Sequence, residues 1–307
     1  MSRRKPKVAV LLSTYNGEAF LAAQLDSLLA QESVSLEVFA RDDGSSDGTL
    51  AILERYSPHW PALATPIGGH NLGPAQSFLA LLAAAPGDFD YYAFCDQDDV
   101  WLPGKLARAA SRLGVVEGKP ALYCSRVICA DENLRPLGER WIRGDNRFEH
   151  LLYENIAFGT TVVLNAAARS GIVSKPLGPG PIMHDWWCAL WTAAFGEIVH
   201  DDRWAGVLYR QHGRNVLGAR PTRLGEIISR LRLFRRDPDG FWPVRRQAGA
   251  FLRLHGDQLG PSERAAIDAL LNSDRSFWAR VRFAFSRRVV RGDSGLTARL
   301  LILVDRY

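Results

Sequence analysis

Residues 36–49 read LEVFARDDGSSDGT, and this stretch decides the expected fold. The apolar start, LEVFA at 36–40, is typical of a buried strand, and the polar run after it is typical of a turn that opens a helix. Residues 7–13, KVAVLLS, form a second apolar run rich in β-branched residues and predict another buried strand. Between them, apolar side chains recur at helical spacing over 18–31, which predicts an amphipathic helix.

The alternation of strands and helices continues beyond this stretch. Helices are expected at 49–56 and 74–84, followed by a third buried strand, YYAFC, at 91–95. This order predicts an α/β fold with a mainly parallel sheet that helices cover on both faces. Ligands bind such sheets where the strands end. Polar clusters follow the three strands at 14–16, 42–47 and 96–99, so we expect them to meet along one edge of the sheet.

The pattern is less regular in the rest of the chain. A helix is expected at 105–113, strands at 121–130 and 160–164, and a helix rich in aromatic residues at 186–195. From about residue 221 onward only helical periodicity is visible. We therefore expect a catalytic domain over 1–218 and an Arg-rich helical region over 219–307.

The charge is distributed unevenly along the chain. The 307 residues carry a net charge of +5, but residues 203–307 hold 21 arginines, no lysine and nine acidic residues. An acidic N-terminal part suits metal binding, and a basic C-terminal part suits an anionic partner such as a membrane surface. A genome that favours arginine explains the basic part equally well, so both interpretations are open.

Cysteine usage and hydropathy indicate the compartment. The four cysteines form no CxxC pair and have apolar or aromatic neighbours, which is typical of buried free thiols in a reducing environment. No apolar stretch approaches the ~20 residues that span a bilayer, and the apolar run at 8–12 is too short for a signal peptide. The sequence predicts a cytoplasmic protein, with peripheral attachment to the inner membrane as the open alternative.

Two polar clusters carry candidate chemistry. Carboxylates at i and i+2, as in Asp96-Gln97-Asp98-Asp99, can face one ion where the chain turns, and Mg²⁺ and Mn²⁺ prefer such oxygen ligands. A solvated acidic loop or a helix N-cap is the alternative interpretation. The run at 42–49 contains more Asp and Ser residues than capping one helix requires. The excess favours contacts with a ligand such as a base and a ribose.

Four motifs occur in a familiar order and spacing: Ser13-Thr14-Tyr15-Asn16, DDGSSDGT at 42–49, Asn71-Leu72-Gly73, and DQDD at 96–99 with Trp101-Leu102-Pro103 behind it. Over roughly residues 7–218 the chain resembles family-two glycosyltransferases of the GT-A fold. The resemblance implies a nucleotide-diphosphate sugar donor and a Mn²⁺ or Mg²⁺ ion. It implies donor contacts from Thr14, Tyr15, Asn16, Asp43, Gly44, Ser45, Asn71, Gly73 and Asp96, and metal ligation by Asp96 and Asp98.

The resemblance also assigns roles nearer the C-terminus. Asp185, at the head of a helix, matches the catalytic base, a role that needs an ionised carboxylate within reach of the acceptor hydroxyl. Trp186 and Trp187 follow it and either form an apolar platform for the acceptor sugar or pack in the core. In YRQHG at 209–213, His212 matches a residue that completes the metal site, and Arg210 one that contacts the diphosphate. A purely structural role is the alternative for His212.

The motifs HDWW at 184–187 and YRQHGRN at 209–215 look most like bacterial rhamnosyltransferases of cell-surface polysaccharide synthesis. This implies transfer of L-rhamnose from a dTDP-linked donor to a glycan or lipid-linked glycan in an inverting reaction. A UDP-sugar donor and a non-catalytic nucleotide-sugar-binding module are the alternatives. A dinucleotide-dependent dehydrogenase is excluded because no GxGxxG follows the first strand. No nucleic-acid-binding module is recognisable, and such a partner is not expected.

The segment 277–291 predicts an amphipathic helix near the C-terminus. Phe277, Trp278, Val281 and Phe285 fall on one helical face, with three arginines beside it and Arg288 interrupting it. A helix of this composition can lie in a membrane interface. The alternatives are that it packs on the catalytic domain or on a second subunit.

Overall fold

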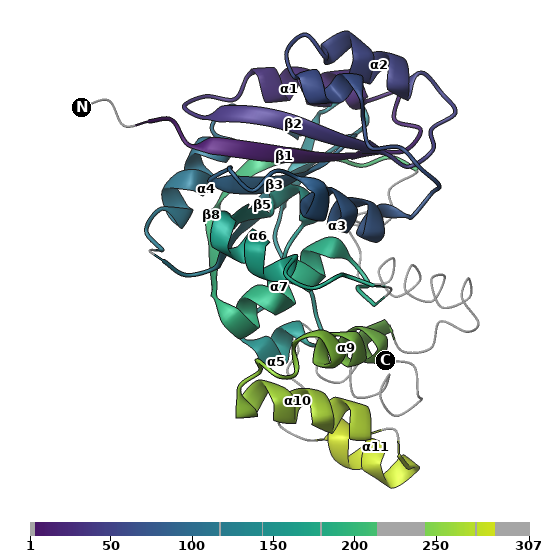
Figure 1. Ribbon diagram of the computed structural model, residues 1–307, viewed down its shortest axis with the longest axis vertical. Helices are drawn as coiled ribbons and strands as arrows, with labels where there is room; N and C mark the ends of the chain where they lie inside the picture. The colour runs from purple at the N-terminus through teal and green to yellow at the C-terminus, as the bar shows by residue number, and fades with distance from the viewer. Residues whose placement is uncertain are drawn as a thin grey trace.

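The computed structural model describes residues 4–285 except for 117, 143, 179, 214–242 and 274, and shows an α/β domain continued by a stack of helices (Figure 1). The described strands form one sheet in the order β2-β1-β3-β7-β5-β8-β4, and β6 pairs with β5. Their bounds are β1 Lys7–Thr14, β2 Ser35–Asp42, β3 Tyr91–Asp96, β4 Val100–Trp101, β5 Ala121–Ala130, β6 Pro136–Arg140, β7 Val163–Asn165 and β8 Glu197–Arg210.

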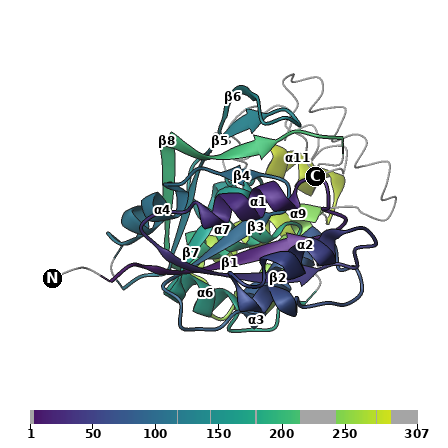
Figure 2. The same ribbon diagram turned by 90° about the horizontal axis from the view of Figure 1, so that it is seen from above.

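Helices cover both faces of this sheet. In β1, Val8, Val10 and Leu12 join one apolar core with α1, α2 and α4, while Ala9 and Leu11 join a second core with α3, α6 and α7. Figure 2 shows α3 and α6 on the opposite side of β1 from α1. The bounds are α1 Leu21–Leu29, α2 Thr49–Tyr56, α3 Pro74–Ala84, α4 Lys105–Leu113, α5 Phe148–Leu151, α6 Ala166–Ile172 and α7 His184–Phe195, with 3₁₀ turns η1 Pro61–Ala64 and η2 Gly159–Thr161.

The sheet is mixed, and most of its paired residues lie in parallel ladders, as expected. β1 runs parallel to β2 and β3, as predicted, and β5 runs parallel to β8. β7 is antiparallel to both β3 and β5, and β4 is antiparallel to β8. The physical reason is that η2, and no crossover helix, leads directly into β7, so the chain enters the sheet from the opposite end. The α/β class itself is confirmed.

Three further helices are described after residue 242: α9 Pro243–His255, α10 Pro261–Asn272 and α11 Phe277–Ala284. They continue one stack that descends from α7 through α9 and α10 to α11 (Figure 1). The ring of Phe251 in α9 lies 5.3 Å from that of Trp187 in α7, and both belong to one apolar core. The predicted boundary at residue 218 lies outside the described residues. None of the described helices is long and apolar enough to cross a bilayer.

Candidate active site

The three polar clusters lie side by side at one edge of the sheet, as the sequence predicts. β1, β2 and β3 are parallel and end in register, so that Thr14 pairs with Asp42 and Ser13 pairs with Asp96. The side chains that follow these strands therefore surround one region. The loops at 15–18, 43–48 and 97–99 lie next to one another at this edge.

The loop at 15–18 is fixed by side chains from neighbouring loops. Its four consecutive backbone N–H groups each donate a hydrogen bond to a side-chain oxygen. These bonds join Tyr15 to Gln97, Asn16 to Ser45, Gly17 to Thr49 and Glu18 to Asp47, at 2.8, 2.8, 2.8 and 3.1 Å. The polar excess in the 42–49 run is therefore largely used inside the protein. The expectation that this excess contacts a ligand does not hold for the side chains that make these bonds.

Gln97 joins the loop after β1 to the loop after β3. Its Oε1 accepts the N–H of Tyr15 at 2.8 Å, and its Nε2 donates to the carbonyl oxygen of the same residue at 2.9 Å. Gly17 makes room for this amide, because a Cβ at position 17 would lie 2.2 Å from Oε1. Sequence reasoning missed Gln97, since a DxD pattern treats the middle residue as a spacer. Gly17 was the only feature of the sequence that could have indicated this contact.

Asp42 and Thr14 hold each other in the interior. The carboxylate of Asp42 accepts bonds from the Thr14 hydroxyl at 2.9 Å and from the N–H and hydroxyl of Ser45 at 2.8 and 2.6 Å. Thr14 is fully buried. Its side chain therefore does not reach a nucleotide in this conformation, which corrects the prediction that it contacts the donor. Gly44 supplies the positive φ of 90° that this tight loop requires.

Asp43 organises the loop at 71–73. Its carboxylate oxygens accept the N–H groups of Leu72 and Gly73, both at 2.8 Å. It is also ion-paired with the buried guanidinium of Arg41. The side chain of Asn71 caps the same turn by accepting from Gly73 N–H at 3.0 Å. The structure thus brings the predicted residues Asp43, Asn71 and Gly73 together, with Asp43 buried beneath the loop.

The acidic loop lies near α7. The pKa of Asp96 is raised to about 8, mainly by burial and also by the negative charges of Asp98 and Asp185. The head of α7 packs on β3 next to this loop, because the ring of His184, which precedes Asp185, lies 4.6 Å from that of Phe94, two residues before Asp96. Asp98 Oδ2 lies 2.7 Å from Nε2 of His212, whose ring packs on Phe20 with centroids 4.9 Å apart.

The metal ligands expected from the sequence are only partly assembled. Asp98 and His212 are adjacent, and their oxygen and nitrogen atoms suit Mn²⁺, with the oxygen also suiting Mg²⁺. Among the described residues, however, no group of three or more His, Cys, Asp or Glu side chains has a metal-holding arrangement. Asp96 is therefore not part of a ready-made three-ligand cage. Two protein ligands leave positions for diphosphate oxygens and water.

Two buried charged residues, Asp99 and Lys105, lie at or just after the acidic loop. Asp99 is fully buried and accepts the backbone N–H of Arg210 at 3.0 Å, so it anchors β8 and does not cap α4. Burial raises the pKa of Asp99 well above its usual value. The Nζ of Lys105 lies 3.2 Å from the centre of the Trp101 ring and has no hydrogen-bond partner among the described residues. Burial lowers the pKa of Lys105 to about 7.

The side chain of Arg210 is bound to neighbouring parts of the protein. Its Nε donates to the carbonyl oxygen of Asp98 at 2.7 Å, another guanidinium nitrogen bonds the carbonyl of Glu132, and the group stacks 4.6 Å from the ring centre of Phe20. The side chain is buried. The prediction that Arg210 contacts the diphosphate therefore does not hold in this conformation, because its guanidinium is already engaged in holding the acidic loop against β8.

Asp185 occupies the first turn of α7. One carboxylate oxygen accepts the N–H of Trp186 at 2.7 Å, and Asn155 provides a further hydrogen bond. Burial raises the pKa of Asp185 to about 6, which still leaves it ionised at neutral pH. The neighbouring His184 is sandwiched between Phe78 and Phe94, at centroid distances of 4.0 and 4.6 Å, and burial lowers its pKa to about 3. His184 is thus a neutral core residue.

The two tryptophans after Asp185 have different surroundings. Trp187 is fully buried against Phe251, so the prediction that it forms an acceptor platform does not hold. Trp186 is partly exposed, and its indole N–H donates to the carbonyl of Leu151 at 2.5 Å. Of the pair, Trp186 alone keeps ring surface available to a ligand.

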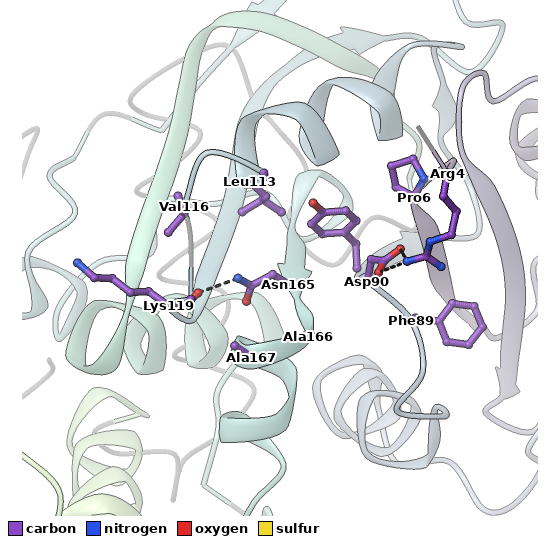
Figure 3. Close-up of a pocket in the computed structure, with 13 residues that line it drawn as sticks. Arg4, Pro6, Phe89, Asp90, Leu113, Val116, Lys119, Asn165, Ala166 and Ala167 are labelled. Carbon is purple, nitrogen blue, oxygen red and sulfur yellow. Dashed lines mark hydrogen bonds and ion pairs between the residues drawn. The ribbon is translucent and has the colours of Figure 1, made fainter. Parts of the chain in front are cut away.

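A cavity of about 430 Å³ lies at the opposite edge of the sheet, where β1 and β3 begin (Figure 3). Arg4 and Asp90 form an ion pair of 2.8 Å across its rim, and Asn165 and Lys119 line its other side. It contains none of the residues discussed above. Its position at the amino ends of the strands separates it from the candidate active site.

The fold and the acidic strand-end site define a nucleotide-sugar transferase of the GT-A type. Residues 9–173, more than half of the chain, match the sequence profile described as "Glycosyl transferase family 2". The chain therefore belongs to glycosyl transferase family 2.

Particular relatives agree with this assignment. The chain is 28% identical over 216 residues to the dTDP-rhamnosyl transferase RfbG of Shigella flexneri, covering 68% of this chain and 74% of that protein. It is 30% identical over 217 residues to the uncharacterized protein Rv1520 of Mycobacterium tuberculosis, covering 68% of this chain and 60% of that one.

Solved structures share the fold. TarS residues 1–349 from S. aureus, in complex with UDP, align with a TM-score of 0.57 and 17% identity, covering 97% of this chain and 81% of that one. The mannosyltransferase PcManGT from Pyrobaculum calidifontis, in complex with GDP-Man and Mn²⁺, aligns with a TM-score of 0.52 and 15% identity, covering 98% and 88%. At these identities the likeness concerns the fold alone.

Proposed function

We propose that this glycosyltransferase moves L-rhamnose from dTDP-rhamnose to a glycan or lipid-linked glycan during cell-surface polysaccharide synthesis, in a metal-dependent, inverting reaction. The observation that carries the proposal is the buried carboxylate of Asp185 at the head of α7, which packs through His184 on Phe94 of β3, two residues before the acidic loop. The rhamnosyl donor is supported by similarity to a protein described as a dTDP-rhamnosyl transferase.

The donor lies, in this proposal, along the edge where β1, β2 and β3 end. The base and ribose occupy the space between the loops at 15–18 and 71–73. Exposed Tyr15 and the side-chain NH₂ group of Asn16 offer contacts, and buried Asp43 shapes the space through Leu72 and Gly73. Asp96 contacts the ribose. The rigidity of both loops lowers the ordering cost of binding, because their backbone groups are already fixed by hydrogen bonds.

Asp98 and His212 would hold the Mn²⁺ or Mg²⁺ ion, which when bound offsets the negative charge of the leaving diphosphate. Asp185 accepts the proton of the acceptor hydroxyl as that oxygen attacks the anomeric carbon. Its bonds from Trp186 N–H and Asn155 orient the carboxylate. A carboxylate with a pKa near 6 is a stronger base than an exposed one and is still ionised at pH 7. Partly exposed Trp186 lies next to it and offers a ring face to the acceptor sugar.

A donor panel tests this proposal. We expect release of nucleoside diphosphate from dTDP-rhamnose in the presence of an acceptor and Mn²⁺ or Mg²⁺, with less release after chelation. Asp185→Asn should lower the rate on the order of 10²–10⁴-fold while donor binding is kept. Asp202→Asn, on a partly exposed position of β8, is the matched control and should leave the rate unchanged.

Three results would contradict parts of this proposal. Turnover with a UDP-sugar in place of dTDP-rhamnose would move the proposal to the alternative donor. Donor binding without any turnover across the panel would favour a non-catalytic nucleotide-sugar-binding module. Full activity of Asp185→Asn would remove the general-base assignment.

Lipid-linked acceptors bring the reaction to a membrane. We therefore place the protein in the cytoplasm, in peripheral contact with the inner membrane through its Arg-rich C-terminal region.

A further inference from the structure

The helix α11 presents large aromatic side chains to solvent. Phe277 is 54% exposed, Trp278 is 73% exposed and Phe285, just after the helix, is 59% exposed. Soluble proteins rarely cluster exposed aromatic side chains within nine residues, and such clusters mark contact surfaces. We name Phe277 and Trp278, with the exposed Arg275 and Arg282, the α11 surface.

The opposite side of α11 explains why these aromatics stay outside. Phe283 and Ala284 are buried, and the ring of Phe283 packs 6.1 Å from that of Tyr153. The helix therefore already has an apolar face turned to the protein. The face expected from sequence included Val281, which is only half-buried, and left out Phe283. Phe277 and Trp278 belong to a second apolar surface that the helix stack does not cover.

The segment that begins directly after Asp274 is strongly basic. Residues 275–291 read RSFWARVRFAFSRRVVR, with six arginines and no acidic residue in seventeen positions. Two of these arginines, Arg275 and Arg282, are exposed within the described part of the chain. Basic segments of this density attract anionic lipid headgroups, worth about 1 kcal/mol per Lys or Arg near the surface. Tryptophan and phenylalanine are the side chains that settle at the boundary between headgroups and acyl chains.

The position of α11 suits an acceptor delivered from a membrane. The helix stack runs from α7, which carries Asp185, through α9 and α10 to α11 at the far end (Figure 1). The α11 surface therefore lies at the end of the helix stack that is farthest from the sheet. Contact there leaves the strand edge at β1, β2 and β3 free for the donor.

We propose that the α11 surface binds an anionic lipid membrane, with Phe277 and Trp278 entering the interface and Arg275 and Arg282 on the headgroups. This deepens the proposed function and rests on it only for the choice of a lipid-linked acceptor. A second copy of the chain is a poorer partner, because two such surfaces would bring like charges together. A nucleic acid would bind the arginines, but the motif has no accompanying recognition module.

Vesicle flotation of the full-length chain tests the proposal. We expect the protein to float with vesicles of 70% phosphatidylcholine and 30% phosphatidylglycerol at 100 mM salt. It should remain in the soluble fraction with pure phosphatidylcholine or at 500 mM salt, since added salt screens surface charge. Phe277→Ser/Trp278→Ser should lower the partition coefficient on the order of ten- to a hundredfold, because two exposed aromatic rings lose their burial in lipid. Arg275→Gln/Arg282→Gln should lower it about five- to thirtyfold.

The control is Val115→Ser/Leu137→Ser, which removes two other exposed apolar side chains, 76% and 64% accessible, from the segment after α4 and from β6. This variant should float like the parent. Because the α11 side chains lie outside the active site, their variants should release nucleoside diphosphate normally with a soluble acceptor, so loss of flotation and loss of catalysis are separate readouts.

Several outcomes overturn the proposal. One is failure of the parent chain to float with anionic vesicles at low salt, and another is equal flotation of the Phe277→Ser/Trp278→Ser variant. A dimer in solution that becomes monomeric in this variant would assign the surface to a second copy. A retarded RNA band that is lost in the same variant, without flotation, would assign it to nucleic acid.

Discussion

Replacing Gln97 tests whether the two loops of the donor site must be held together. Gln97→Ala removes both hydrogen bonds to the backbone of Tyr15, at 2.8 and 2.9 Å, and leaves the acidic loop otherwise unchanged. Gly17→Ala reaches the same contact from the other side, since its Cβ would lie 2.2 Å from Gln97 Oε1 and would push the amide away.

The structure sets the size of the effect. A hydrogen bond contributes about 0.5–1.5 kcal/mol net, and both bonds here are near the surface, where water can replace part of each. Losing both bonds should therefore reduce the free energy that holds the loop in its donor-binding conformation by about 1–2 kcal/mol. At 1.4 kcal/mol per factor of ten, donor binding should weaken about five- to thirtyfold. Because both substitutions act on one contact, the double variant should be no worse than the poorer single variant.

Titration calorimetry with the nucleoside diphosphate and Mn²⁺ measures this effect. Gln31→Ala is the matched control, because Gln31 also joins backbone groups of another segment, donating to Leu102 at 2.9 Å and accepting from Leu106 at 3.2 Å. It should lower the melting temperature without changing donor affinity. Unchanged affinity in Gln97→Ala, or additive losses in the double variant, would refute the reasoning.

Two further predictions concern titration. The rate of transfer should rise between pH 5 and 7 with a midpoint near 6, because Asp185 has its pKa raised to about 6 and acts only when ionised; the pH–rate profile of Asp185→Asn should lack this limb. The ring of His184 should stay neutral at pH 5 by NMR, because its pKa is lowered to about 3. Since the unfolded chain then binds the proton more readily, His184 destabilises the fold as pH falls below about 6.5, and His184→Leu should show a shallower loss of unfolding free energy over that range.

Local pattern was enough to predict the half of the sheet that carries the donor site. The helices at 49–56, 74–84 and 105–113 agree with α2, α3 and α4, and the three strand-end clusters meet as expected. The strand β8 was not predicted, because it contains charged residues that a hydropathy pattern assigns to a loop. Within β8, Asp201 is buried, and its charge is balanced by a salt bridge of 2.6 Å to Arg108, which lies 93 residues away in sequence.

The errors within the site have one physical origin. Residue identity indicates what a side chain can bind, but its direction depends on contacts distant in sequence. Thr14 turns inward to Asp42, Arg210 turns to the carbonyl of Asp98, and Trp187 turns to Phe251. Each of these partners lies 28 or more residues away. Ligand-binding chemistry and loop-fixing chemistry use the same residue types, so only the fold separates them.

The packing of Phe251 on Trp187 bears on how the enzyme can be produced in shorter form. A fragment that stops near residue 218 would contain all the sequence motifs discussed above. It would also expose to solvent the apolar side of α7 that α9 covers. Such a fragment would tend to precipitate during purification, and its inactivity would say nothing about the chemistry of Asp185. The minimal working enzyme therefore has to include α9.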